Sequence, residues 1–123
     1  MSKNPEIFSH ACKCMLVDSH THIHFPIYDG DREAVIKRAK AAGVKMVCVG
    51  TQAASSEAAV DLARKNPGEI WATAGFHPNH FASAWYYDRK EQKEAKREKF
   101  DATRLRKIAA KPENNSPWYM VFL

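Results

Sequence analysis

The feature that most constrains the fold of this chain is a short apolar run that leads directly into two closely spaced histidines. Residues 15–17 are apolar and predict the end of a buried β-strand, and residues 18–22 read Asp-Ser-His-Thr-His. Side chains at positions i and i+2 of a strand point to the same side, so His20 and His22 can aim two imidazoles at one point. Two imidazoles so placed can bind a divalent metal ion, which makes both residues candidate metal ligands. The alternative is that they are ordinary surface or core histidines.

Length and composition limit what the chain can be. Its 123 residues predict one domain and are about half of what a complete eight-fold βα barrel needs. No stretch approaches the ~20 apolar residues of a membrane-spanning helix, and residues 1–8 lack the apolar core of a secretory signal. The three cysteines show no disulfide spacing. We therefore expect a cytoplasmic protein with no membrane partner.

Strand and helix signals alternate along the chain. Apolar runs predict strands near residues 15–18, 45–49 and 70–75, with a possible fourth at 118–123. Helices are expected over residues 31–42, from Ser55 or Ser56 to Lys65, and within 88–110. This rhythm predicts an α/β domain of parallel βα units over residues 15–123, preceded by an extension over residues 1–14. The third helix has a weak apolar face made by Leu105, Ile108 and Ala109.

The polar residues that look functional follow the strands. His20 and His22 come at the end of the first expected strand, and His77 follows the third. The carboxyl ends of parallel strands meet at one edge of a sheet, where α/β proteins collect their chemistry. The sequence therefore predicts that three histidines from two strands lie at the same edge.

The sequence resembles the N-terminal part of the TatD family of metal-dependent deoxyribonucleases, which belong to the amidohydrolase-type barrels. Five pieces carry the resemblance, in order and at plausible spacing: residues 16–22, 29–36, 41–44, 49–51 and 75–78. The resemblance implies a TIM-type (β/α)8 barrel that hydrolyses phosphodiester bonds of DNA. It also implies one or two divalent metal ions, which would be Mg²⁺, Mn²⁺ or Zn²⁺.

The resemblance assigns roles to individual residues. His20 and His22 match the family's metal-binding His-x-His, and His77 matches the histidine of its Gly-x-His-Pro stretch. His77 is thus expected to face the substrate or to support the site from behind the ligands. His24 stands where the family usually has Asp or Asn. It could be a third ligand, or simply a loop histidine.

Other ligands that the resemblance implies have no match. The family supplies a Glu from the fourth strand, histidines from two later strands and an Asp near the last one, whereas residues 116–123 contain no Glu. We therefore expect a barrel truncated after about three units, with an incomplete metal site and no activity alone. Such a chain could be a truncated or frameshifted family member or one piece of a split protein. It could then self-associate or bind a complementary C-terminal fragment.

Two other functions remain open at this point. A PHP-type metal-dependent phosphoesterase also opens with Asp-x-His-x-His. A non-catalytic nucleic-acid-binding or interaction protein could instead use residues 88–111, which hold ten Lys/Arg and five Asp/Glu while the rest of the chain balances. The neighbouring aromatic residues 85–87 could stack on bases. The alternative is an ordinary solvated helix with interleaved charges.

A second candidate metal site lies in the N-terminal extension. Cys12 and Cys14 follow His10 at Cys-x-Cys spacing. Zinc sites more often use Cys-x₂-Cys, so the alternative is a loosely ordered extension without a metal.

Overall fold

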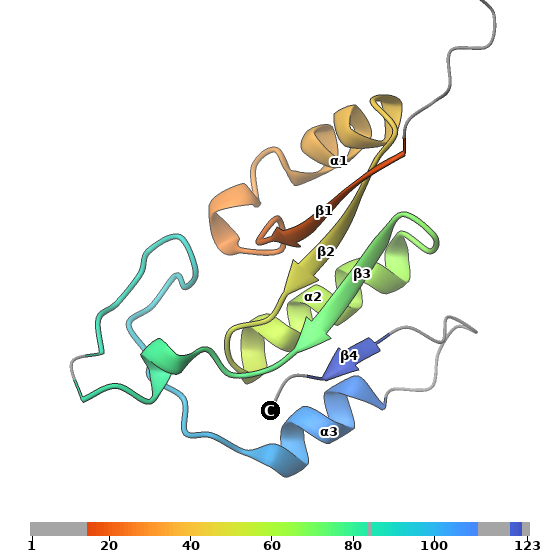
Figure 1. Ribbon diagram of the computed structural model, residues 1–123. Helices are drawn as coiled ribbons and strands as arrows, with labels where there is room; N and C mark the ends of the chain where they lie inside the picture. The colour runs from red at the N-terminus through yellow and green to blue at the C-terminus, as the bar shows by residue number, and fades with distance from the viewer. Residues whose placement is uncertain (1–14, 84, 111–118, 122–123) are drawn as a thin grey trace, which may run out of the picture.

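The computed structural model describes residues 15–83, 85–110 and 119–121 of the chain (Figure 1). Strands and helices alternate, and two short 3-10 helices follow β1 and β3. In chain order the elements are β1 (Leu16–Thr21), η1 (Pro26–Tyr28), α1 (Arg32–Ala41), β2 (Val44–Val49), α2 (Ala53–Lys65), β3 (Ile70–Ala74), η2 (Pro78–His80), α3 (Ala102–Ala109) and β4 (Tyr119–Val121).

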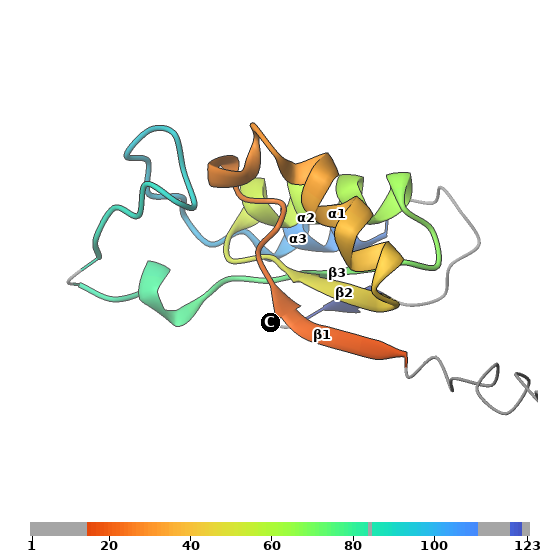
Figure 2. The same ribbon diagram turned by 90° about the horizontal axis from the view of Figure 1, so that it is seen from above.

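The strands form one parallel sheet in the order β1-β2-β3-β4. All four arrowheads therefore point to the same edge in Figure 1. Figure 2 shows α1, α2 and α3 together on one face of the sheet, and no described helix covers the other. The predicted α/β class with parallel strands is confirmed. The candidate extension at residues 1–14, with Cys12 and Cys14, lies outside the described residues.

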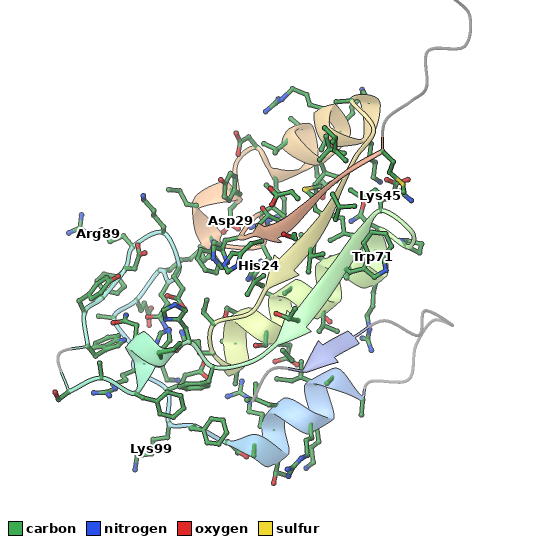
Figure 3. The ribbon with its side chains drawn as sticks, viewed as in Figure 1. His24, Asp29, Lys45, Trp71, Arg89 and Lys99 are labelled. Atoms are coloured by element: carbon green, nitrogen blue, oxygen red, sulfur yellow. The ribbon has the colours of Figure 1, made fainter. Side chains whose placement is uncertain are left out.

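The core lies between the sheet and the helices. Alternation along β2 turns Met46 and Cys48 toward the helices, where both are buried. The uncovered face carries Lys45, whose ammonium lies 5.6 Å from the centre of the Trp71 ring (Figure 3). The buried apolar cluster on the helix side comprises Ile23, Ile36, Met46, Cys48, Ala53, Ala59, Val60, Leu62, Ala63, Ile70, Ala72, Ala74, Leu105 and Ile108.

Helix α2 begins earlier than the sequence indicated. Its N-cap is Gln52, so the predicted start at Ser55 or Ser56 is wrong by about a turn. The reason is that the Ser55 hydroxyl accepts hydrogen bonds from the amides of Thr51 and Gln52, at 2.8 and 3.0 Å. A serine one turn inside the helix thus satisfies amides that precede it.

The charged segment before α3 does not form a regular solvated helix. Residues 88–101 contain turns and irregular backbone, and α3 occupies only Ala102–Ala109. The Asp101 side chain caps this helix by accepting from the Arg104 amide at 2.9 Å. Leu105 and Ile108 are buried, which confirms the apolar face predicted for this helix.

Across residues 15–83, 85–110 and 119–121, no helix is long and apolar enough to cross a membrane.

Candidate metal and substrate site

The two histidines of the His-x-His run lie side by side at the carboxyl end of β1. His20 is within the strand and His22 directly follows it. Their ring centroids are 5.1 Å apart and the ring planes are almost perpendicular, at 88°. The structure therefore brings together the imidazoles that the sequence singled out.

The strand that presents them is not regular. Asp18 pairs with Met46 and Thr21 with Cys48, so β1 uses three residues where β2 uses two. The register therefore shifts by one residue here, a bulge-like irregularity of the kind that re-aims side chains at the end of a strand. Asp18 accepts a hydrogen bond from the backbone amide of His20 at 3.1 Å. The bulge thus replaces the simple alternation from which the shared direction of the two rings was predicted.

His22 is oriented by the neighbouring strand. Its Nδ1 lies 3.0 Å from the carbonyl oxygen of Val49 at the end of β2. A proton on Nδ1 would leave Nε2 as the free lone pair, which is how many proteins orient a metal-binding imidazole. Burial lowers the pKa of His22, and the nearby His20 and His77 act in the same direction. The Val49 carbonyl and Glu91 oppose this shift.

His24 is buried and differs chemically from the pair. It is 5% exposed, and neither ring nitrogen has a hydrogen-bond partner among the residues that the structure describes. Burial, followed by the charges of His22 and Arg32, lowers its pKa to about 3. Its ring packs 4.8 Å from that of Phe25. His24 is therefore a neutral imidazole at physiological pH.

These residues fit part of a metal centre. His20 and His22 can supply two nitrogen ligands, whereas a catalytic zinc-type site normally uses three protein ligands. Within the part of the chain that the structure describes, no group of three or more His, Cys, Asp or Glu side chains could hold a metal ion. The described residues thus provide a histidine pair.

Arg32 holds the loop that follows the histidine pair. Its guanidinium donates to the carbonyl oxygens of Ile23 and Phe25, both at 2.8 Å, and to Asp29 at 2.8 Å. Hydrogen bonds from Lys93 and Arg32 lower the pKa of Asp29. Sequence reasoning gave Arg32 no role of its own, although its place at the first turn of α1 puts it beside this loop.

His77 lies at the same edge of the sheet. Its amide donates to the Thr51 carbonyl at 2.7 Å, which ties the end of β3 to the end of β2. Its Nδ1 accepts from the Asn79 amide at 3.1 Å and begins η2. The side chain is exposed, and its charge contributes to the lowered pKa of His22. His77 is thus placed within electrostatic reach of the histidine pair.

A partly buried carboxylate that the sequence did not indicate also lies at this edge. Glu91 accepts a hydrogen bond from the Thr51 hydroxyl, and its Oε1 is 3.0 Å from Nε2 of His80. His80 is only 4% exposed. The charge of Glu91 raises the pKa of His22, so this carboxylate lies near the pair as well. Its partners are up to 40 residues away in sequence, and no local pattern could have revealed them.

The rest of the charged segment binds other parts of the same chain. Glu98 accepts hydrogen bonds from the amides of Ala53 and Ala54 at 3.0 and 3.1 Å, at the start of α2. Lys93 pairs with Asp29 at 2.7 Å. The Arg97 guanidinium donates to carbonyl oxygens in the η2 region. Several of the charges that suggested a free nucleic-acid surface therefore fix this segment over the carboxyl edge.

Comparison with known proteins gives a consistent result. The sequence pattern of the family described as TatD related DNase matches residues 17–114. The chain is 41% identical over 87 residues to the "3'-5' ssDNA/RNA exonuclease TatD" of Pantoea vagans, which covers 70% of this chain and 28% of the relative. The protein of that name in Cronobacter turicensis is 40% identical over 87 residues, which also cover 70% of this chain and 28% of the relative. That of Erwinia tasmaniensis is 54% identical over 56 residues, 45% of this chain and 21% of the relative.

The matched region carries every element of the candidate site. It begins just before the histidine pair and continues through His77 and the charged segment to the end of α3. The chain spans about a quarter of the length of these relatives. Since the family pattern matches most of the sequence, the chain belongs to the TatD related DNase family.

Proposed function

We propose that this chain supplies the first βα units of a TIM-type barrel that hydrolyses phosphodiester bonds in single-stranded nucleic acid. In this proposal His20 and His22 are its ligands to a divalent metal ion, which is Mg²⁺, Mn²⁺ or Zn²⁺. His77 contacts the substrate. The remaining ligands come from later βα units, which would reach this chain as a complementary C-terminal segment.

The placement of the histidine pair carries the proposal. The rings lie 5.1 Å apart at the carboxyl edge of a parallel sheet, and the Val49 carbonyl orients one of them. This is the edge at which βα barrels hold their active sites. A divalent ion there would supply the Lewis acidity that phosphodiester hydrolysis needs.

The arrangement of the layers favours a closed barrel rather than an open sheet. An open parallel sheet is normally covered by helices on both faces. Here the described helices cover only one face (Figure 2). In a closed barrel the other face lines the interior, so one layer of helices is sufficient. The names of the relatives, which describe 3'-5' exonucleases acting on single-stranded DNA and RNA, support the substrate class.

A chimera tests this function. Residues 15–80 would replace the corresponding segment of the Pantoea vagans relative, and cleavage of a labelled single-stranded DNA would be measured with Mg²⁺, Mn²⁺ and Zn²⁺. The chimera should cleave the DNA. The double substitution His20→Ala, His22→Ala should lower the rate by about 100-fold or more, because it removes two metal ligands. The isolated 123-residue chain should not cleave, since its described residues provide only a pair.

Two results would overturn the proposal. One is a folded chimera that is inactive with all three ions. The other is a chimera whose metal-dependent activity survives the double substitution. His24→Ala in the same chimera is the matched control for removing a neighbouring imidazole, and its metal dependence should be unchanged.

A further inference from the structure

Three phenylalanine rings form a cluster beside the candidate site. The ring centroids of Phe76 and Phe81 are 5.2 Å apart, those of Phe76 and Phe100 5.6 Å, and those of Phe81 and Phe100 5.5 Å. Phe76 packs against the buried core. Phe81 is 57% exposed and Phe100 44% exposed. One ring therefore anchors the cluster to the fold, while the other two present aromatic surface to solvent.

The cluster lies next to the residues that the proposed function uses. Phe76 directly precedes His77, and its ring centroid is 5.6 Å from that of the buried His80. Phe81 follows η2, and Phe100 precedes α3, so segments 19 residues apart in sequence meet at the carboxyl edge. The exposed rings thus flank the edge at which the histidines gather.

Two exposed cationic side chains precede Phe100 in the charged segment and line the same surface hollow as Phe100. Lys99 directly precedes Phe100 and points away from the ribbon into solvent in Figure 3. Lys96 is also exposed. Neither ammonium takes part in an ion pair with any described residue. This distinguishes them from Lys93, which pairs with Asp29.

Exposed rings beside unpaired cations suit one class of partner. Proteins that bind single strands combine aromatic faces, on which unpaired bases stack, with cations that follow the phosphates. A duplex hides its base faces, and a free phosphate has none. We propose that Phe81 and Phe100, supported by Phe76, form a stacking platform for an unpaired base. The phosphates of the same strand then pass Lys96 and Lys99 on the way to His77.

This inference deepens the proposed function by locating where the strand is held, and it needs no metal ion. Binding of a fluorescein-labelled oligo(dT) to the 123-residue chain would be followed by anisotropy in EDTA. Phe81→Ala and Phe100→Ala should each weaken binding by about 5- to 100-fold, the range expected for loss of one stacked base. An abasic oligomer of equal length and a duplex should bind more weakly than oligo(dT).

Conservative and matched variants separate stacking from folding. Phe81→Trp and Phe100→Tyr keep an aromatic face and should retain binding. Ile27→Ala removes an equally exposed apolar side chain, 56% exposed on η1, and should bind like the parent chain. Thermal unfolding of each variant would confirm an intact fold, which is expected because Phe81 and Phe100 are exposed.

Three binding results would overturn the stacking platform without affecting the proposed function. Alanine variants that bind oligo(dT) as tightly as the parent would overturn it, as would an abasic oligomer that binds equally well. Loss of binding in Phe81→Trp would also overturn it. Because the assay contains no metal ion, a failed platform leaves the chimera's metal-dependent cleavage unaffected, and a failed chimera leaves oligo(dT) binding unaffected.

Discussion

Replacing Gly50 by alanine is expected to lower the free energy of unfolding by about 3 kcal/mol or more, because the site has no room for a methyl group. Gly50 lies just after β2, where α2 and the end of β3 approach it closely. A Cβ there would lie 2.7 Å from Cα of Ser56 and 2.7 Å from the Thr73 carbonyl oxygen. Both are backbone atoms, so the clash cannot be relieved by a change of rotamer.

The surrounding hydrogen bonds make this junction stiff. The Gly50 amide donates to the Thr73 carbonyl at 3.2 Å. The hydroxyl of the fully buried Ser56 accepts from the Gly75 amide at 3.1 Å and lies 3.2 Å from its carbonyl oxygen. A shift of β2 would break contacts that hold α2 to Gly75, two residues before His77.

Urea unfolding measures the effect, and Gly30→Ala is the matched control. A Cβ at Gly30 would meet no atom of the described residues within 4 Å, so the free energy of unfolding of Gly30→Ala should differ from the parent by less than about 0.5 kcal/mol. Adding Ser56→Ala to Gly50→Ala should restore little, because the clash with backbone atoms remains. Equal stability of Gly50→Ala and Gly30→Ala would show that β2, α2 and β3 are not packed as described.

Acidification from about pH 6.5 to about pH 4.5 is expected to cost about 2–3 kcal/mol of folding stability through His24 alone. The folded chain holds the pKa of His24 at about 3, whereas the ordinary value is 6.5. Between these values the unfolded chain binds a proton at His24 that the folded chain excludes. The stability that neutral His24 contributes is therefore fully present above pH 6.5 and is lost as the pH decreases toward 3.

Substitution of the imidazole tests this cause. His24→Leu has no proton to bind at this position, so its unfolding free energy should depend less on pH over the same range. The measurement is urea unfolding in EDTA at about pH 6.5 and about pH 4.5, a range that lies above the ordinary pKa values of Asp and Glu. Parent and His24→Leu curves with the same pH dependence would show that His24 is accessible to protons in the folded chain.

The sequence was a good guide wherever the signal was local. Apolar runs near residues 45–49 and 70–75 became β2 and β3, and Gly43, with a φ of 72°, follows α1 where a C-terminal stop was expected. Leu105 and Ile108 marked the buried face of α3 in a segment of high charge. Hydrophobic periodicity and helix capping depend on neighbours within a few residues, so these elements could be predicted from the sequence alone.

It was a poor guide where the contacts are long-range. The bulge in β1 depends on pairing with β2, and Ser55 caps amides rather than starting the helix itself. Glu91 and Glu98 lie in a segment without regular structure, yet their carboxylates contact Thr51 and the start of α2. These contacts join residues 40 to 45 positions apart, so no periodicity within the segment could predict them.

A zinc titration tests whether His20 and His22 together bind a metal ion. Calorimetry would follow Zn²⁺ binding to a chain with Cys12→Ser and Cys14→Ser, so that these thiols do not contribute. We expect one ion per chain, with binding lost in His20→Ala, His22→Ala and retained in His77→Ala and His24→Leu. The same stoichiometry and affinity in the double variant would contradict the assignment of His20 and His22 as the metal ligands.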